Sequence, residues 1–264
     1  MIVRGRAGRF RPALPPYAAR RFATAAMVGV VVYVLVDVVL QFLPPHYSVV
    51  SDAESNLAVG PFGWIMNLNF LGRAGLTLCA AAAIGLVGPP TRLRGAGLVL
   101  LIVAGACSAA LAFLPTDINP AGEFGLRAST LAGTLHLIVA SLGFFAALAA
   151  FALLTGWLRA TRELRRVYPA ALALVAVAAA GLLGVGLSDR FEPTLLGVAE
   201  RVCLAGILGW AFVVCAAIRR TMTDPGPAGA DQGSANASQV ETSVSGDSDM
   251  ESIPSAASQR AKSG

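Results

Sequence analysis

Two ionisable residues, Glu200 and Arg201, stand side by side within an apolar stretch that is long enough to span a membrane. Ionisable side chains are costly in the hydrocarbon core of a bilayer, where they pair with one another or mark a site for a ligand. Neighbouring residues on a helix point about 100° apart, so this glutamate and arginine face each other poorly. We therefore expect each of them to meet a partner on another helix.

Other apolar stretches also contain polar side chains, namely Asp37, Asn69, Arg73 and His136. The formal charges of Asp37 and Glu200 balance those of Arg73 and Arg201, which predicts ion pairs between helices. We expect Glu200 to pair with Arg73, and Arg201 to pair with Asp37 or Asp117. Asn69 and Arg73 are four residues apart, so they share one helix face.

The composition identifies the elements that carry these residues. Hydrophobic residues make up 56% of the 264-residue chain and charged residues only 13%, against about 25% in soluble domains. Runs of roughly 20 apolar residues match a bilayer core when they are helical. The sequence thus predicts an all-α membrane protein, a bundle of six transmembrane helices at about 22–43, 62–87, 97–114, 133–155, 169–188 and 195–218.

The arginines predict the orientation of this bundle. They are concentrated before the first span, between spans two and three, between spans four and five, and after span six, whereas the opposite loops hold only Arg127 and Arg190. Because basic residues favour the cytoplasmic side, we expect both termini in the cytoplasm and a multi-pass protein of the bacterial cytoplasmic (plasma) membrane. The basic residues flank the spans, so the net charge of +5 does not indicate nucleic acid as a partner.

Three parts of the chain follow from this pattern. Residues 1–21 form a basic cytoplasmic segment, residues 22–218 form the six-helix transmembrane domain, and residues 219–264 form a cytoplasmic tail. The tail is rich in Gly, Ser, Ala, Asp and Pro and lacks apolar periodicity, so it is expected to be disordered.

The predicted topology places the polar side chains of four spans in one layer, the outer half of the bundle. The outward loops add acids and hydroxyls, chiefly Ser51, Asp52, Glu54 and Asp117. Together these residues predict an outward-facing polar cup with the buried charges as its floor. The candidate cluster comprises Asp37, Ser51, Asp52, Glu54, Asn69, Arg73, Asp117, His136, Glu200 and Arg201.

Four motifs follow one another along the chain, "SDAESNLAVGPFGWIMNLNF", "FLPTD", "GTLHLIVA" and "AERVCLAG". In this order, separated by apolar helices, they resemble the bacterial membrane protein family catalogued as domain of unknown function 998, over about residues 22 to 218. The resemblance implies that the key positions are Ser51, Asp52, Pro115, Thr116, Asp117, His136, Glu200 and Arg201. The family brings no established activity.

Three functions remain open at this stage. In the first, the charges hold the helices together and small residues allow close helix packing. These small residues are Gly72, Gly75, Gly181, Gly184, Gly206 and Gly209. Alternatively, the cup binds a membrane lipid head group, a small solute or a cation.

The third possibility is a membrane-embedded enzyme that acts on a lipid at the outer leaflet. Asp117 and His136 would then form an acid/base pair, with Ser51 as nucleophile, or a metal would be held by Asp52, Asp117 and His136. Triads are recognised by geometry, which spacing does not give. The chain has only two histidines, so we expect no histidine-rich zinc site and no resident cofactor.

Overall fold

The computed structural model describes residues 16–44, 47–120 and 122–222. The predicted tail lies outside these residues from position 223 onward, and so do the first 15 residues of the predicted basic segment. The described residues form helices joined by loops and contain no strand.

Six α-helices are long and apolar enough to cross a membrane within the described part of the chain. They are α1 (Pro16–Leu40), α2 (Gly63–Gly85), α3 (Arg92–Leu111), α4 (Leu131–Ala160), α5 (Tyr168–Phe191) and α6 (Leu196–Thr221). Three short 3-10 helices lie in the connections, η1 (Glu54–Ala58), η2 (Arg165–Val167) and η3 (Pro193–Leu195). The all-α fold with six spans is confirmed, with span ends that differ from the predicted ones by a few residues.

Local sequence explains where the helices begin. Thr91 and Thr130 precede α3 and α4, and their hydroxyls accept hydrogen bonds from the N–H groups of Arg94 and Gly133. Such N-caps satisfy N–H groups that the first helical turn leaves without a partner. A proline at the start of α5 has no N–H to satisfy and fits the first turn.

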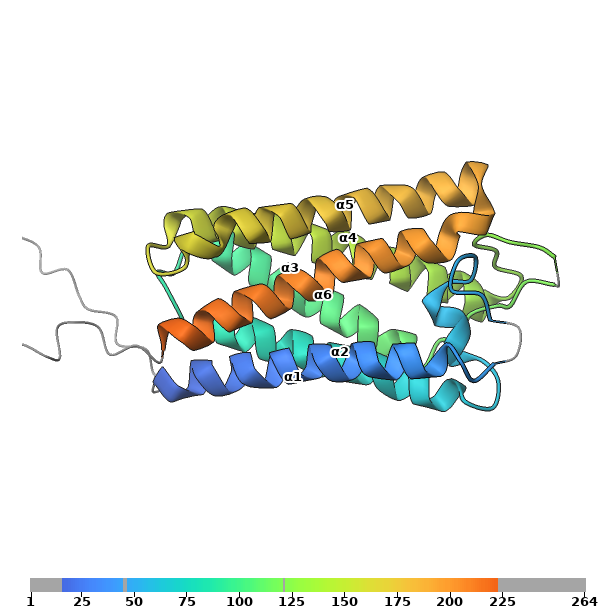
Figure 1. Ribbon diagram of the computed structural model, residues 1–264, viewed down its shortest axis with the longest axis horizontal. Coiled ribbons are helices and arrows are strands. Elements are labelled where there is room, and N and C mark those ends of the chain that lie inside the picture. Colours follow the sequence, from blue (N-terminus) through green and yellow to red (C-terminus); the bar gives the residue numbers. More distant parts are fainter. Residues whose placement is uncertain (1–15, 45–46, 121, 223–264) are drawn as a thin grey trace, which may run out of the picture. The chain divides into compact units, whose positions relative to one another are not determined.

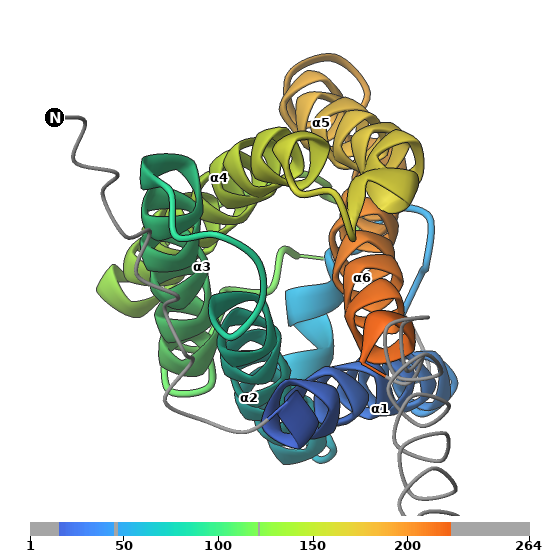
Figure 2. The same cartoon turned by 90° about the vertical axis from the view of Figure 1, so that its left-hand side faces the viewer.

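The helices are arranged in a ring in chain order, with α1 beside α2, α3 beside α4, α5 beside α6, and α6 closing the ring on α1 (Figures 1 and 2). The connections 41–62, 112–130 and 192–195 lie at one end, which we call the acidic-loop end. The opposite end holds the connections 86–91 and 161–167. The acidic-loop end therefore carries the two long connections, 41–62 and 112–130, whereas the connections at the opposite end are short.

Large apolar side chains cover the outside of this ring. Val31, Leu35, Phe145 and Leu183 are among the many that are exposed. A soluble monomer rarely exposes apolar patches on this scale, whereas a lipid-facing surface requires them. The chain is a multi-pass membrane protein.

Glycines bring α5 and α6 into backbone contact. A Cβ on Gly206 would lie 2.7 Å from the Cα of Ala178, and one on Gly181 would collide with the backbone of Cys203. The prediction that small residues allow close packing is confirmed at these two positions. It is wrong for Gly72 and Gly75, where an added Cβ would meet no atom within 4 Å.

Candidate functional site

The connection from α1 to α2 folds back into the acidic-loop end of the bundle. Its 3-10 helix η1 buries Leu57 and the side chain of Glu54, which is only 2% exposed. The sequence placed Glu54 in a water-exposed acidic loop, and the structure corrects this. The η1 segment packs against α2 and α6 and is joined to α1 by the hydrogen bond from Tyr33 to Glu54.

The Glu54 carboxylate joins α1 and α2. Its Oε1 accepts a hydrogen bond from the Tyr33 hydroxyl at 2.7 Å, and its Oε2 lies 3.9 Å from an Arg73 guanidinium nitrogen. Burial raises the pKa of Glu54 to about 8, because the Arg73 charge offsets only part of the cost of ionising a carboxyl away from water. The sequence reasoning missed Tyr33, although it precedes Asp37 by four residues and so shares its helix face.

Arg73 connects three helices. Its Nε donates to the Ser108 hydroxyl on α3 at 2.8 Å, and one terminal nitrogen donates to the Tyr33 hydroxyl on α1 at 3.1 Å. Ser108 in turn donates to the Phe70 carbonyl at 2.9 Å. The guanidinium also lies 5.5 Å and 5.1 Å from the ring centres of Tyr33 and Phe70. These contacts hold the charge in place with a side chain that is 14% exposed.

Glu200 does not form the predicted ion pair with Arg73. Its Oε2 accepts a hydrogen bond of 2.7 Å from the backbone N–H of Glu54. Within the described residues, the ion pairs closer than 4.0 Å are Arg73 with Glu54 and Arg127 with Glu123. The pairing hypothesis was therefore wrong, because a loop that was assigned to water supplies the partner of Arg73.

Arg201 binds backbone carbonyls in place of an acid. One terminal nitrogen donates to the carbonyls of Val49, Asp52 and Gly197 at 3.1, 3.3 and 3.0 Å, and the other donates to the Tyr47 hydroxyl. The loop thus lies against the first turns of α6. The predicted partners Asp37 and Asp117 are not within ion-pair distance.

Asp37 lies at the edge of this cluster. Its Oδ2 accepts from the Gln41 amide at 2.6 Å, while its buried Oδ1 has no hydrogen-bond partner. The Nε of Arg201 is also buried without a partner, and the charges of these two residues act on each other. Asn69 has a different role, since its amide donates to the Tyr33 carbonyl at 3.1 Å and joins α2 to α1.

Asp117 acts as a clasp between two segments of the loop before α4. Its carboxylate accepts hydrogen bonds from the N–H groups and hydroxyls of Ser129 and Thr130, at 2.7–3.2 Å. These bonds, led by those from Thr130, lower the pKa of Asp117. A Cβ on Gly133 would collide with this carboxylate, so the close approach requires the glycine. Asp117 is thereby engaged in holding the loop.

Ser51 and Asp52 shape the turn that Arg201 holds. The Asp52 carboxylate accepts from the Ser48 N–H at 2.7 Å, and the Ser51 N–H donates to the Ser48 hydroxyl at 3.3 Å. Both residues line a small cavity of about 20 Å³ together with Asp117. His136 is not among its lining residues.

His136 is 1% exposed and is fixed by one strong contact. Its Nδ1 lies 2.6 Å from the Leu114 carbonyl. A carbonyl only accepts, so Nδ1 carries the proton and, in the neutral ring, Nε2 is left as an acceptor. The acid/base pair with Asp117 is absent from the described contacts, and no group of three or more His, Cys, Asp or Glu in the described residues is arranged to hold a metal ion.

A cavity of about 90 Å³, which we call the chamber, lies among these groups. Its polar lining residues are Glu54, Ser55, Arg73, His136, Ser141 and Glu200. The ionisable groups of this lining are two carboxyl groups, one guanidinium and one imidazole. The structure thus brings Glu54, Arg73, His136 and Glu200 around one cavity and leaves Ser51, Asp52 and Asp117 around another.

Comparison with known proteins gives one result. The family model described as "Protein of unknown function (DUF998)" matches residues 27–217. No curated protein and no solved structure matches the chain.

Proposed function

We propose that this membrane protein, which belongs to the DUF998 family of proteins of unknown function, binds a positively charged polar group in the chamber. The proposal rests on the chemistry of the chamber lining. The group is the head of a membrane lipid or a small solute. A purely structural charge cluster would be expected to pack closed, and the observation that supports binding is the cavity of about 90 Å³ beside Glu54, Arg73, His136 and Glu200.

With Glu54 and Glu200 both ionised, the charges of the chamber favour a cation with hydrogen-bond donors. The two lining carboxylates outnumber the lining guanidinium. Hydrogen bonds from Tyr33 and from the Glu54 N–H occupy only one oxygen of each carboxylate, and Arg73 approaches the second oxygen of Glu54 only at 3.9 Å. A protonated primary amine supplies three donors and one positive charge, which complements this lining.

Binding of a small amine tests the proposal. Purified full-length protein in phosphatidylcholine nanodiscs is titrated with ethylammonium and with acetate, and heat release is compared with that of empty discs. We expect ethylammonium to bind and acetate not to bind. Glu200→Gln should weaken ethylammonium binding about tenfold or more, whereas Glu192→Gln, an exposed carboxylate at the same end of the bundle, should leave it unchanged. Equal affinities in both variants would refute the proposal.

We also infer that both termini lie in the cytoplasm and that the bundle resides in the plasma membrane. The arginines support this orientation. The acidic-loop end carries Arg127 in a connection and Arg190 in the last turn of α5, whereas the opposite end carries Arg92, Arg94, Arg159, Arg162, Arg165, Arg166, Arg219 and Arg220. A membrane-impermeant maleimide applied to intact cells should label Glu123→Cys but not Glu163→Cys. Both positions are exposed, and the reverse pattern would overturn the orientation.

A further inference from the structure

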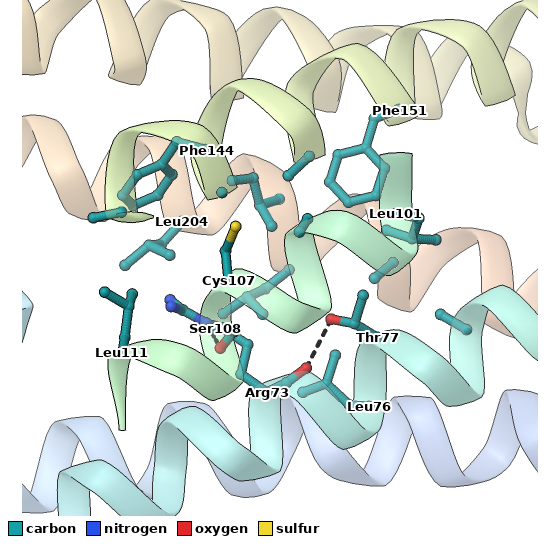
Figure 3. A pocket seen from close by; sticks show the side chains of 18 residues that line it. Arg73, Leu76, Thr77, Leu101, Cys107, Ser108, Leu111, Phe144, Phe151 and Leu204 are labelled. Atoms are coloured by element: carbon teal, nitrogen blue, oxygen red, sulfur yellow. Dashed lines mark hydrogen bonds between the residues drawn. The ribbon is translucent and has the colours of Figure 1, made fainter. Parts of the chain in front are cut away.

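A third cavity, of about 60 Å³, lies between α2, α3, α4 and α6. Its lining is apolar apart from Arg73, Thr77, Cys107 and Ser108. Figure 3 shows Arg73 and Ser108, joined by their hydrogen bond, near Leu111 and Phe144, while Leu101 and Phe151 lie at the opposite end of the cavity. Arg73 is the one charged residue that lines this cavity.

The chamber and this apolar cavity adjoin each other at four shared lining residues. Arg73, Leu111, Ala140 and Phe144 line both of them. On one side of this junction the carboxylates and His136 line the chamber, and on the other side the lining is apolar. A polar compartment followed by an apolar one is the arrangement that an amphiphile requires.

The chamber also reaches the outer face of the bundle between α4 and α5. Ser141 and Phe145 of α4 line it and are both exposed, Phe145 by 62%, and Leu182 and Val185 of α5 line it from the other side. Both helices are long and apolar enough to cross a membrane, so their outer face is the one that we expect to contact lipid. A ligand from the bilayer therefore has a lateral route to the chamber.

The size of the apolar cavity limits what it holds. On α2 its lining runs from Arg73 to Ala80, about 10 Å along the helix at ~1.5 Å per residue. A water needs roughly 10–15 Å³ of such space, so about 60 Å³ corresponds to a handful of waters. This space suits part of one alkyl chain and excludes a second chain beside it.

We propose that the ligand of the chamber is a single-chain amphiphile with a protonated primary amine as its head. The amine lies against the carboxylates of Glu54 and Glu200, and the alkyl chain passes the Arg73 junction into the apolar cavity. This inference rests on the proposed function, and it adds the class of the ligand and the place of its chain.

Three probes and one cavity-filling variant test the inference. The full-length protein in phosphatidylcholine nanodiscs is titrated with octylammonium, ethylammonium and octanoate, each corrected for partition into empty discs. Octylammonium should bind about tenfold or more tighter than ethylammonium, because additional methylene groups leave water. Ala147→Leu fills the buried apolar cavity from α4, and it should remove this advantage without changing ethylammonium binding.

Controls separate the possible failures. Ala149→Leu makes the same change at an exposed position of α4 and should leave all affinities unchanged. If Ala147→Leu does not fold, Ala104→Leu fills the same cavity from α3.

Equal affinities for the two amines, with no effect of either filling variant, would overturn the inference. The proposed function would still be supported if Glu200→Gln weakens ethylammonium binding. Amine binding that is indifferent to Glu200→Gln would overturn both. Tighter binding of octanoate than of octylammonium would assign the head group to Arg73 and overturn the amine class.

Discussion

The carboxylate of Glu200 accepts a hydrogen bond from the backbone N–H of Glu54, 2.7 Å away and 146 positions earlier in the chain. This contact fixes η1 against the first turns of α6. The Glu54 side chain is therefore held between Tyr33 of α1 and Arg73 of α2, and its carboxylate contacts both of them. One partly buried acid thus positions a fully buried one.

Replacing Glu200 tests this relationship. Glu200→Leu leaves the Glu54 N–H without its acceptor, and it should lower the free energy of unfolding by about 1.5–3 kcal/mol, the range for hydrogen bonds to charged groups. Glu200→Gln retains an amide oxygen as an acceptor and should cost less. Reversible unfolding of the purified protein in detergent measures both values, and equal losses in the two variants would contradict the assigned contact.

The spans were predictable because they depend on local properties. Long apolar stretches, flanking prolines and charged loops determine where α1 to α6 begin and end, and each signal lies within the segment that it describes. The ring arrangement adds the choice of neighbours, and connection length does not decide it, because α1 packs on α2 and α3 packs on α4 across the long connections 41–62 and 112–130.

The partners of the buried charges were not predictable in the same way. The positions of Asp37, Arg73, Glu200 and Arg201 along their spans were sufficient to place them near one end of the bundle. Their contacts depend on the path of residues 41–62, which the sequence pattern assigned to water. Backbone carbonyls from this loop accept hydrogen bonds from one terminal nitrogen of Arg201, and carbonyls carry no signature in the sequence.

The Asp117 clasp predicts a dependence of loop order on pH. Hydrogen bonds from Thr130 and Ser129 lower the pKa of Asp117 in the folded protein, from about 3.9 for an unperturbed aspartate. A carboxyl with a lowered pKa stabilises the fold above the unfolded value and loses this contribution as pH falls through the folded value. The amides of Ser129 and Thr130 should therefore be protected from hydrogen exchange above about pH 4 and lose protection below it.

Asp117→Asn provides the control for this prediction. The amide no longer carries the charge that strengthens the bonds to Thr130, so protection of both amides should fall at all pH values. Protection that survives this substitution unchanged would show that other contacts hold the loop.

The glycines of α5 and α6 predict unequal effects of the same substitution. Gly206→Ala would place a methyl group 2.7 Å from the Cα of Ala178, so the two helices must separate, at a cost of about 1–3 kcal/mol. Gly72→Ala adds the same methyl group where no atom lies within 4 Å, and it should be neutral or slightly stabilising. Thermal unfolding in detergent compares the two variants, and a similar loss in both would contradict the α5–α6 packing described here.

Glu54 predicts how amine binding depends on pH. Burial raises the pKa of Glu54 to about 8, and the groups that face it are Tyr33, Asp37, Arg73 and Glu200. A bound ammonium favours the ionised carboxylate, so binding below this pKa must release a proton from Glu54. The affinity for ethylammonium should rise almost tenfold per pH unit from about pH 6 to 8 and then level off, because an alkyl amine stays protonated up to a pKa near ~10.

Glu54→Gln should bind more weakly and flatten this profile, and calorimetry in two buffers of different protonation enthalpy measures the released proton directly. A slope that persists in Glu54→Gln would assign the titration to another of the facing groups.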